Sequence, residues 1–386
     1  MTERLYYKDA YKTEFSAVVT GRTNDYVILD KTYFYPKGGG QPGDIGFLGD
    51  APVTDCRIKN GEIVHIADNR FQIGQEITGR VNFLRRYGFM QNHTGEHIVS
   101  GIVSKRYGFE NVGFHLSANS MTFDFNGEIP KDELDMVEDM ANDAVYQNIA
   151  IETNFMEGSA LEAINYRSKK QIDGPVRLVN IEGFDTCACA GLHVMHCGEV
   201  GIIKIVSAQR YKGGTRLLAV CGRDALHDYR QKNESVLKIS ALLSAKPHDI
   251  SAGVEDLLAA MAEQRKITAG LRSEIFSHKA GAIAEGTPFA LFFEEGLSAD
   301  EARRFAYEAA SRANIAFVFC SAGDKPDYYK YAICSRKAGA NIAKIAKDLN
   351  EALNGRGGSS NEISQGAVNA SKSSIEQYIK NRGEYH

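Results

Sequence analysis

Two pairs of potential metal ligands have the same four-residue spacing in this sequence. His93 and His97 occur in QNHTGEHIVSG, residues 91–101. Side chains four apart share one face of a helix, so two imidazoles at this spacing can hold one metal ion. The segment CACAGLHVMHCGEVG, residues 187–201, repeats the spacing with Cys189 and His193. Thiolate and imidazole ligands favour zinc over magnesium or calcium. The residue types predict a zinc site completed from this second segment, which also contains Cys187, His196 and Cys197.

The first segment also fits H-x-x-E-H, a signature of inverted-type zinc peptidases. A peptidase of this type needs a distal glutamate ligand, and it would leave the Cys189/His193 pair unexplained. A closed, purely structural zinc site is a second alternative. The role of Glu96 stays open, and simple solvation on the helix surface is one reading of it.

A third segment could approach a ligand with its backbone. YFYPKGGGQPGDIG, residues 33–46, has three successive glycines followed by Gln41. Glycine lets the main chain come close to a ligand and expose its N–H groups, and glutamine can both donate and accept hydrogen bonds. The alternative is a tight turn between strands.

The surrounding patterns predict an α+β protein of several domains. Short β-branched and aromatic runs before residue 84 predict a small barrel-like domain, and a helix over the His93 segment is predicted to end near Gly108. Long proline-poor stretches then indicate a helical spacer, and the alternation after Gly286 indicates a small α/β domain. The predicted domains are 1–84 (β-barrel-like, with the glycine loop), 85–222 (α+β, zinc-binding), 223–285 (helical spacer) and 286–386 (α/β).

The composition is that of an ordinary globular protein and does not identify a binding partner. The chain has 386 residues, 43% hydrophobic residues and a formal net charge of −4, which gives no global sign of a polyanion partner. No apolar run is long enough to span a membrane, and the first residues are too polar for a secretory signal. We therefore expect a cytoplasmic location and no membrane partner. The 7 cysteines fit reduced thiols and metal ligands better than a disulfide framework.

In order and spacing, the three segments YFYPKGGGQPGDIG, HTGEH and CAGLHV…GEVGIIKI resemble the editing module of alanyl-tRNA synthetases. They are still more similar to its free-standing relatives, the alanyl-tRNA editing proteins of the AlaX type. The C-terminal stretch GANIAKIAKDLNEALNGRGGSSNEISQGAV resembles the DHH-associated domain of those synthetases. With both parts present and no aminoacylation domain, the chain resembles the long AlaX form.

The resemblance implies a zinc-dependent deacylase that removes serine or glycine from wrongly charged tRNA(Ala). Its zinc ligands would be His93, His97, Cys189 and His193. The aminoacyl pocket would be lined by the glycine loop, namely Gly38, Gly39, Gly40 and Gln41. Here Ala190 and Leu192 stand where the family usually has glycine and threonine.

Discrimination between serine and alanine requires a site that hydrogen-bonds a hydroxyl group. His115 and Ser117, in VGFHLSANS, are candidates for this contact. For tRNA, the stretch 201–240 holds eight Lys/Arg against three Asp/Glu. This surplus predicts phosphate contacts from Lys204, Arg210, Lys212 and Arg216, in and around the segment RYKGGTR. Arg356, in the glycine-rich C-terminal loop, is a further candidate for tRNA binding.

One further feature concerns assembly. Val254, Leu257, Leu258, Met261, Leu271 and Ile275 form a roughly one-sided apolar stripe on the second long helix of the spacer. The stripe allows a homodimer through the spacer or the C-terminal domain. The hypotheses that remain open are a tRNA ester hydrolase, a zinc peptidase, and a catalytically silent tRNA-binding protein with structural zinc.

Overall fold

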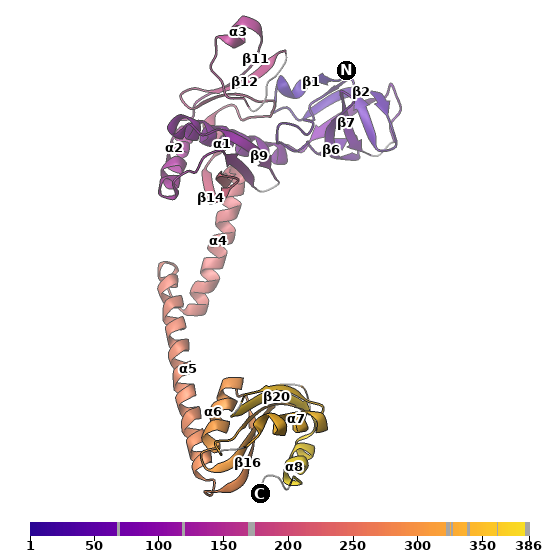
Figure 1. Cartoon of the computed structure of the whole chain (residues 1–386). Coiled ribbons are helices and arrows are strands. Elements are labelled where there is room, and N and C mark those ends of the chain that lie inside the picture. Colours follow the sequence, from indigo (N-terminus) through magenta and orange to yellow (C-terminus); the bar gives the residue numbers. More distant parts are fainter. Residues whose placement is uncertain are drawn as a thin grey trace. The chain divides into compact units, whose positions relative to one another are not determined.

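The computed structural model of the chain describes residues 1–67, 70–117, 120–168, 174–321, 325, 327–337, 340–360 and 362–382. The chain folds into two compact units, Met1–Lys238 and Ile239–His386 (Figure 1). Helices and several sheets occur together, so the predicted α+β class is confirmed. None of the helices within the described ranges is long and apolar enough to cross a bilayer.

The first unit begins with six antiparallel strands whose pairing returns to its starting point. Their buried and exposed residues alternate, as in β8, because one face of each strand is turned to the core. The pairing order is β2–β3–β7–β6–β5–β8, and β8 pairs again with β2. Two short parallel strands, β1 (Glu3–Arg4) and β4 (Lys31–Thr32), lie beside this set. The bounds are β2 (Glu14–Arg22), β3 (Tyr26–Leu29), β5 (Gly46–Leu48), β6 (Ala51–Lys59), β7 (Glu62–Ala67) and β8 (Glu76–Val81).

Helix α1 (Phe83–Tyr107) runs through the centre of the first unit, and its residues 89–103 are all buried. The side chain of Asn82 accepts a hydrogen bond from the backbone N–H of Arg85 and caps the start of the helix. Gly108, with a φ of 70°, ends it in the left-handed conformation. The helix predicted around His93 and its stop at Gly108 are therefore confirmed.

Helix α1 packs against a four-stranded antiparallel sheet and against helix α2 (Leu134–Gln147). The sheet has the order β14–β15–β10–β9. A second sheet, β11–β12–β13, lies on another side of α1, and β13 leads directly into the segment with the predicted cysteine and histidine ligands. The bounds are β9 (Asn111–Leu116), β10 (Met121–Phe125), β11 (Ile151–Met156), β12 (Val176–Ile181), β13 (Asp185–Ala188), β14 (Ile203–Tyr211) and β15 (Gly214–Cys221), with the short helix α3 (Gly158–Glu162) after β11.

One hydrophobic cluster fills the first unit. It includes Phe34 and Tyr35 from the glycine-loop segment, Phe89 from α1 and Phe123 from β10. Side chains on both sides of residue 84 thus share one core, and this shared core fixes the glycine loop relative to α1.

The second unit contains most of the long helical stretch and a five-stranded sheet. Helix α4 (Gly222–Leu243) starts in the first unit, and α5 (Ile250–Gly281) follows it. The sheet order is β16–β17–β18–β20–β19, with β16 and β17 parallel and the other pairs antiparallel. Alternate residues of β17 face two separate hydrophobic clusters, one with α6 and one with α7 and α8. The bounds are β16 (Thr287–Glu295), α6 (Ala299–Ala309), β17 (Ala313–Ser321), β18 (Tyr328–Cys334), α7 (Ile342–Ala352), β19 (Arg356–Ser359), β20 (Ile363–Asn369) and α8 (Lys372–Lys380).

Candidate metal centre

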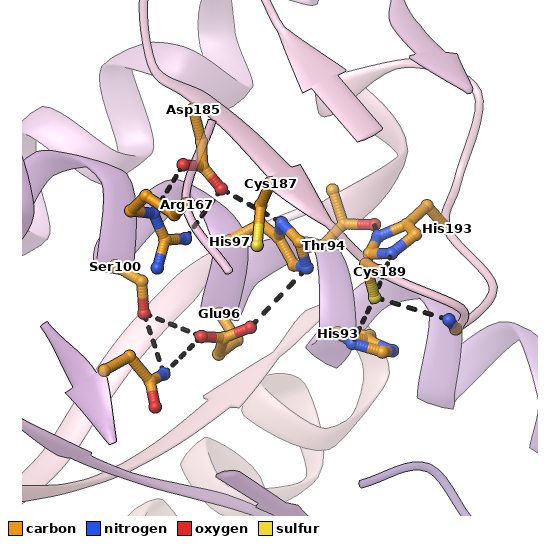
Figure 2. Close-up of polar contacts among 12 residues, drawn as sticks. His93, Thr94, Glu96, His97, Ser100, Arg167, Asp185, Cys187, Cys189 and His193 are labelled. Carbon is orange, nitrogen blue, oxygen red and sulfur yellow. Dashed lines mark hydrogen bonds and ion pairs between the residues drawn. The ribbon is translucent and has the colours of Figure 1, made fainter. Parts of the chain in front are cut away.

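Four potential ligand atoms converge where α1 meets the loop after β13. The ligand atoms of His93, His97, Cys189 and His193 all lie within 4.8 Å of one another. Sγ of Cys189 is 3.4 Å from Nε2 of His93 and 3.5 Å from Nε2 of His193 (Figure 2). The fold therefore brings together two residue pairs that are almost a hundred positions apart in sequence, and it selects Cys189 and His193 from the five candidates in the second segment.

Each of the three imidazoles is held through Nδ1 by a different partner. Nδ1 of His93 lies 3.1 Å from Oε1 of Gln41, and Nδ1 of His193 lies 3.3 Å from Oγ1 of Thr94. Nδ1 of His97 lies 3.0 Å from Oδ2 of Asp185. These contacts leave Nε2 of each ring for a metal, which is the usual arrangement around protein metal sites.

Asp185 is the most strongly anchored of these partners. The guanidinium of Arg167 donates to both of its oxygens, with N···O distances of 2.7 Å. Although burial alone would raise the pKa of the Asp185 carboxyl, the hydrogen bonds from His97 and Arg167 hold it below its ordinary value. Asp185 therefore stays ionised beside His97 and favours the Nδ1–H tautomer of that ring.

The donor set fits zinc. Bond lengths of about 2.0–2.1 Å to nitrogen and about 2.3 Å to sulfur in a tetrahedral site give N···S separations of roughly 3.6 Å. The two measured separations at Cys189 agree with this value. Burial alone would raise the pKa of the Cys189 thiol, yet His93 and His193 hold it well below its ordinary value. Burial, assisted by His93, lowers the pKa of His193 to about 3. A thiolate and a neutral imidazole are the forms that bind metal.

The loop that carries Cys189 is pinned to the rest of the unit. Nη1 of Arg177 donates to the carbonyls of Cys189 and Gly191, and the hydroxyls of Tyr7 and Tyr35 donate to the carbonyl of Ala190. A Cβ at Gly191 would lie 2.0 Å from Cε1 of His93, so only glycine allows this approach.

The predicted glycine loop packs between the ligand loop and β9. A Cβ at Gly40 would lie 2.6 Å from the ring of Phe114, and one at Gly39 would lie 3.7 Å from the backbone nitrogen of Gly191. Oε1 of Gln41 also accepts a hydrogen bond from the N–H of Leu192. Gly38 and Gln41 form a short bridge that closes the turn. In this structure Gln41 contacts a metal-ligand candidate directly, an arrangement that the sequence did not suggest.

The two residues predicted to contact a substrate hydroxyl lie apart from the cluster. His115 is exposed and follows Phe114 on β9, so their side chains point to opposite faces. The ring of Phe114 packs against that of His93 in a tilted arrangement, with a centroid distance of 4.9 Å. The hydroxyl of Ser117 contacts the hydroxyl and carbonyl of Ser120. Phe114 is the β9 side chain at the site, and strand alternation was the signal that could have identified it.

Glu96 is buried, with 3% of its surface exposed, so the solvated reading is wrong. Its Oε1 accepts hydrogen bonds from Ser100, at 2.7 Å, and from Asn111. Its Oε2 lies 3.8 Å from Nε2 of His97. The four-residue donor cluster consists of three histidines and a cysteine and includes no glutamate ligand of the kind that the peptidase hypothesis requires.

A polar cavity of about 960 Å³ lies on the far side of Asp185, the partner of His97, and the four candidate ligands are not among its lining residues. Arg167, Asp185 and Cys187 are among its lining residues, and so is Asn111, which donates to Glu96. Lys105 and Tyr166 add a cation and an aromatic ring. The sequence did not indicate this cavity, because its lining comes from α1, β9, β12, β13 and the segment around residue 167.

The residues predicted to contact tRNA phosphates differ in their surroundings. Lys204 pairs with Glu138 at 2.6 Å, Arg210 pairs with Glu128, and Arg216 makes two bonds of 2.6 and 2.7 Å with Asp124. Lys212 lies at the hairpin tip over the ring of Tyr211. Arg356 is exposed on β19. Residue 361 of the predicted C-terminal loop lies outside the described residues.

Two segments of the first unit match known protein families. Residues 4–85 match the family profile of class II (A) tRNA synthetases, and residues 176–218 match that of the threonyl and alanyl tRNA synthetase second additional domain. An alanine–tRNA ligase of Ignicoccus hospitalis is 32% identical over 303 residues, which make up 75% of this chain. The match covers only about a third (34%) of the ligase itself. The alanyl-tRNA editing protein AlaX-L of Pyrococcus horikoshii is 27% identical over 97% of this chain and 96% of its own length.

Among solved structures, the C-Ala domain of Aquifex aeolicus alanyl-tRNA synthetase resembles 25% of this chain and 91% of its own, with 19% identity and a TM-score of 0.22. The sequence matches show that the first unit contains segments related to tRNA synthetases. Over nearly its full length the chain is similar to that alanyl-tRNA editing protein, and the resemblance drawn from its motifs is confirmed.

Proposed function

We propose that this protein hydrolyses the ester of tRNA(Ala) wrongly charged with serine or glycine, and that it holds a zinc ion on His93, His97, Cys189 and His193. The observation that carries the proposal is the buried cluster of three imidazoles and one thiol, each imidazole fixed through Nδ1. The near full-length similarity to an alanyl-tRNA editing protein supports the choice of substrate.

A zinc ion bound here would act as a Lewis acid toward the ester carbonyl or toward water. The chain's own residues supply the preorganisation. Gln41, Thr94 and Asp185 fix the three rings, and Arg177 fixes the loop of Cys189, so these groups need not reorganise during the reaction. An aminoacyl ester is already activated, and hydrolysis then requires mainly a positioned water and a stabilised oxyanion.

The cavity is the proposed place of nucleotides of the tRNA 3′ end, while the ester itself would lie on the Nε2 side of the imidazole rings. Lys105 and Arg167 would face phosphate or ribose oxygens, and Tyr166 could stack on a base. The glycine loop would shape the opposite side of the site, since Gly39 and Gly40 lie against the ligand loop and β9. Ser117 and His115 would contribute only if the tRNA end reaches beyond Phe114.

Contacts to the body of the tRNA are proposed for Lys204, Arg210, Lys212, Arg216 and Arg356. The ion pairs of Lys204, Arg210 and Arg216 would have to open or be shared with phosphate, so Lys212 and Arg356 are the first candidates. The four-part domain scheme, with a barrel-like first domain, is retained as part of this proposal.

A homodimer through α5 is also proposed. Its residues Val254, Leu257, Leu258, Met261, Leu271 and Ile275 are all exposed in the single chain. A helix stripe of this size is covered in most proteins, and a second copy would bury it.

The decisive experiment compares release of the amino acid from Ser-tRNA(Ala), Gly-tRNA(Ala) and correctly charged Ala-tRNA(Ala), with casein as a peptidase substrate. We expect hydrolysis of one or both mischarged tRNAs, little hydrolysis of Ala-tRNA(Ala), and intact casein. Cleavage of casein would favour a peptidase. Binding of tRNA without ester loss would favour a silent module with structural zinc.

A further inference from the structure

Glu96 stands on the metal-facing side of His97. Nδ1 of His97 is engaged by Asp185 at 3.0 Å, so Nε2 is the nitrogen left to face a metal. Oε2 of Glu96 lies 3.8 Å from that Nε2. Figure 2 marks this pair with a dashed line. The carboxylate therefore borders the space into which the ligand atoms point, although Glu96 is not a member of the four-residue ligand group.

The carboxylate is also oriented by a network of its own. Ser100, one helical turn further along α1, donates to Oε1 at 2.7 Å, and Asn111 of β9 donates to the same oxygen. Asn111 in turn donates to the hydroxyl of Ser100 at 3.0 Å. Two donors on Oε1 fix the rotation of the carboxylate, and Oε2 is thereby directed toward His97.

This network is not needed to hold His97. The Oε2–Nε2 distance of 3.8 Å is beyond hydrogen-bonding range, whereas Asp185 binds the ring through Nδ1 and is itself locked by Arg167. A buried carboxylate is costly to maintain, so an anion fixed at this position needs a compensating function or partner. Arg167 supplies part of the compensation: against the effect of burial, Asp185 is the main cause of its raised pKa, and Glu96 makes a smaller contribution.

We propose that Glu96 is the water-positioning residue of the hydrolysis described above, on which this inference rests. Oε2 accepts a hydrogen bond from the attacking water and aims its lone pair at the ester carbonyl carbon. The water oxygen bonds to that carbon and the bond from carbon to the ribose oxygen breaks. The ribose oxygen leaves with one proton from the water, and the amino acid leaves as its acid with the other.

The test is steady-state hydrolysis of Ser-tRNA(Ala) or Gly-tRNA(Ala), whichever the wild type cleaves, by Glu96→Gln, together with zinc content. In Glu96→Gln the amide oxygen can still accept hydrogen bonds from Ser100 and Asn111. The amide NH2 then takes the place of Oε2, so the water meets a donor where it needs an acceptor. We expect kcat to fall by about a hundredfold with KM little changed, since misplacing a reactant costs about that much. Zinc per chain should equal that of the wild type.

Two further variants separate chemistry from structure. In Glu96→Ala, formate fits the space vacated beside Ser100 and Asn111, and we expect it to restore part of kcat. Asp185→Asn should instead lose zinc, in contrast to the Glu96 variants, which are expected to keep it. Glu76→Gln, which changes an exposed glutamate on β8, is the matched control and should match the wild type in both measurements.

Full kcat in Glu96→Gln, or zinc loss equal to that of Asp185→Asn, would overturn the assignment of Glu96 while leaving the proposed function intact. A wild-type protein that carries zinc but cleaves none of the aminoacyl-tRNAs would overturn the proposed function itself. These two failures are distinguished by the wild-type rate alone.

Discussion

Oε1 of Gln41 lies 3.1 Å from Nδ1 of His93 and accepts a second hydrogen bond, also 3.1 Å long, from the N–H of Leu192. One amide oxygen thus joins the glycine loop, helix α1 and the loop that carries Cys189. The sequence placed Gln41 in a substrate pocket, whereas the geometry makes it a support for a candidate metal ligand.

Gln41→Ala should therefore weaken metal binding. Removing an outer partner of a ligating histidine lowers affinity by about 10- to 100-fold. Competition with a chromophoric zinc chelator measures this change. His115→Ala, on the opposite face of β9, is the control and should bind zinc as the wild type does. If Gln41→Ala keeps wild-type zinc affinity and only raises KM for the aminoacyl-tRNA, the substrate-binding role predicted from sequence is correct.

Cys189→Ser and Cys187→Ser should differ in zinc content. Cys189 is 3.4 and 3.5 Å from two imidazole nitrogens, while Cys187 lies on the Nδ1 side of His97 with Asp185, and burial raises the pKa of its thiol. We expect much reduced zinc in Cys189→Ser and about one zinc per chain in Cys187→Ser. Metal analysis of the purified proteins decides, and the reverse result would transfer the ligand role to Cys187.

Stability should fall in mild acid because of His65. Its ring is fully buried between the hydroxyl of Thr32 and the carbonyl of Val27, and burial lowers its pKa to about 4. In the unfolded chain the pKa is about 6.5, so between these values the unfolded state binds more protons and the free energy of unfolding decreases as pH falls. The decrease should reach roughly 2–3 kcal/mol near pH 4.5.

Urea unfolding at pH 7 and pH 4.5 tests this, with His65→Gln as the comparison. Protonation of the metal ligands affects both proteins alike, so the difference between them isolates His65. An equal loss of stability in wild type and His65→Gln would show that other groups cause the acid sensitivity.

A fragment ending at Lys238, the last residue of the first unit, should retain zinc and the cavity but bind tRNA more weakly. All four proposed ligands and the cavity lining lie before this point. Loss of phosphate contacts such as Arg356 weakens binding and makes its salt dependence shallower. Affinity for tRNA at several salt concentrations is the measurement. If the fragment and the full chain have the same affinity for tRNA and the same dependence of that affinity on salt, the second unit does not bind RNA. Assembly would then remain as its proposed role.

The sequence by itself was sufficient for local features. The four-residue spacing placed His93 and His97 on one helix face, Gly108 marked the end of that helix, and the repeated spacing made Cys189 and His193 one candidate pair among five possible ligands in the second segment. Such features depend on helical periodicity and on residue chemistry, both of which act over a few neighbouring residues.

Only the tertiary structure decided what surrounds those ligands. Gln41, Asp185 and Phe114 reach the cluster from three separate elements, and Glu96 is buried only because β9 and its Asn111 pack on α1. The ion pairs of Arg210 and Arg216 likewise join residues far apart in the chain. Burial and hydrogen bonding between distant segments arise from packing around one shared core, and a charge or spacing pattern within one segment carries no information about its partners.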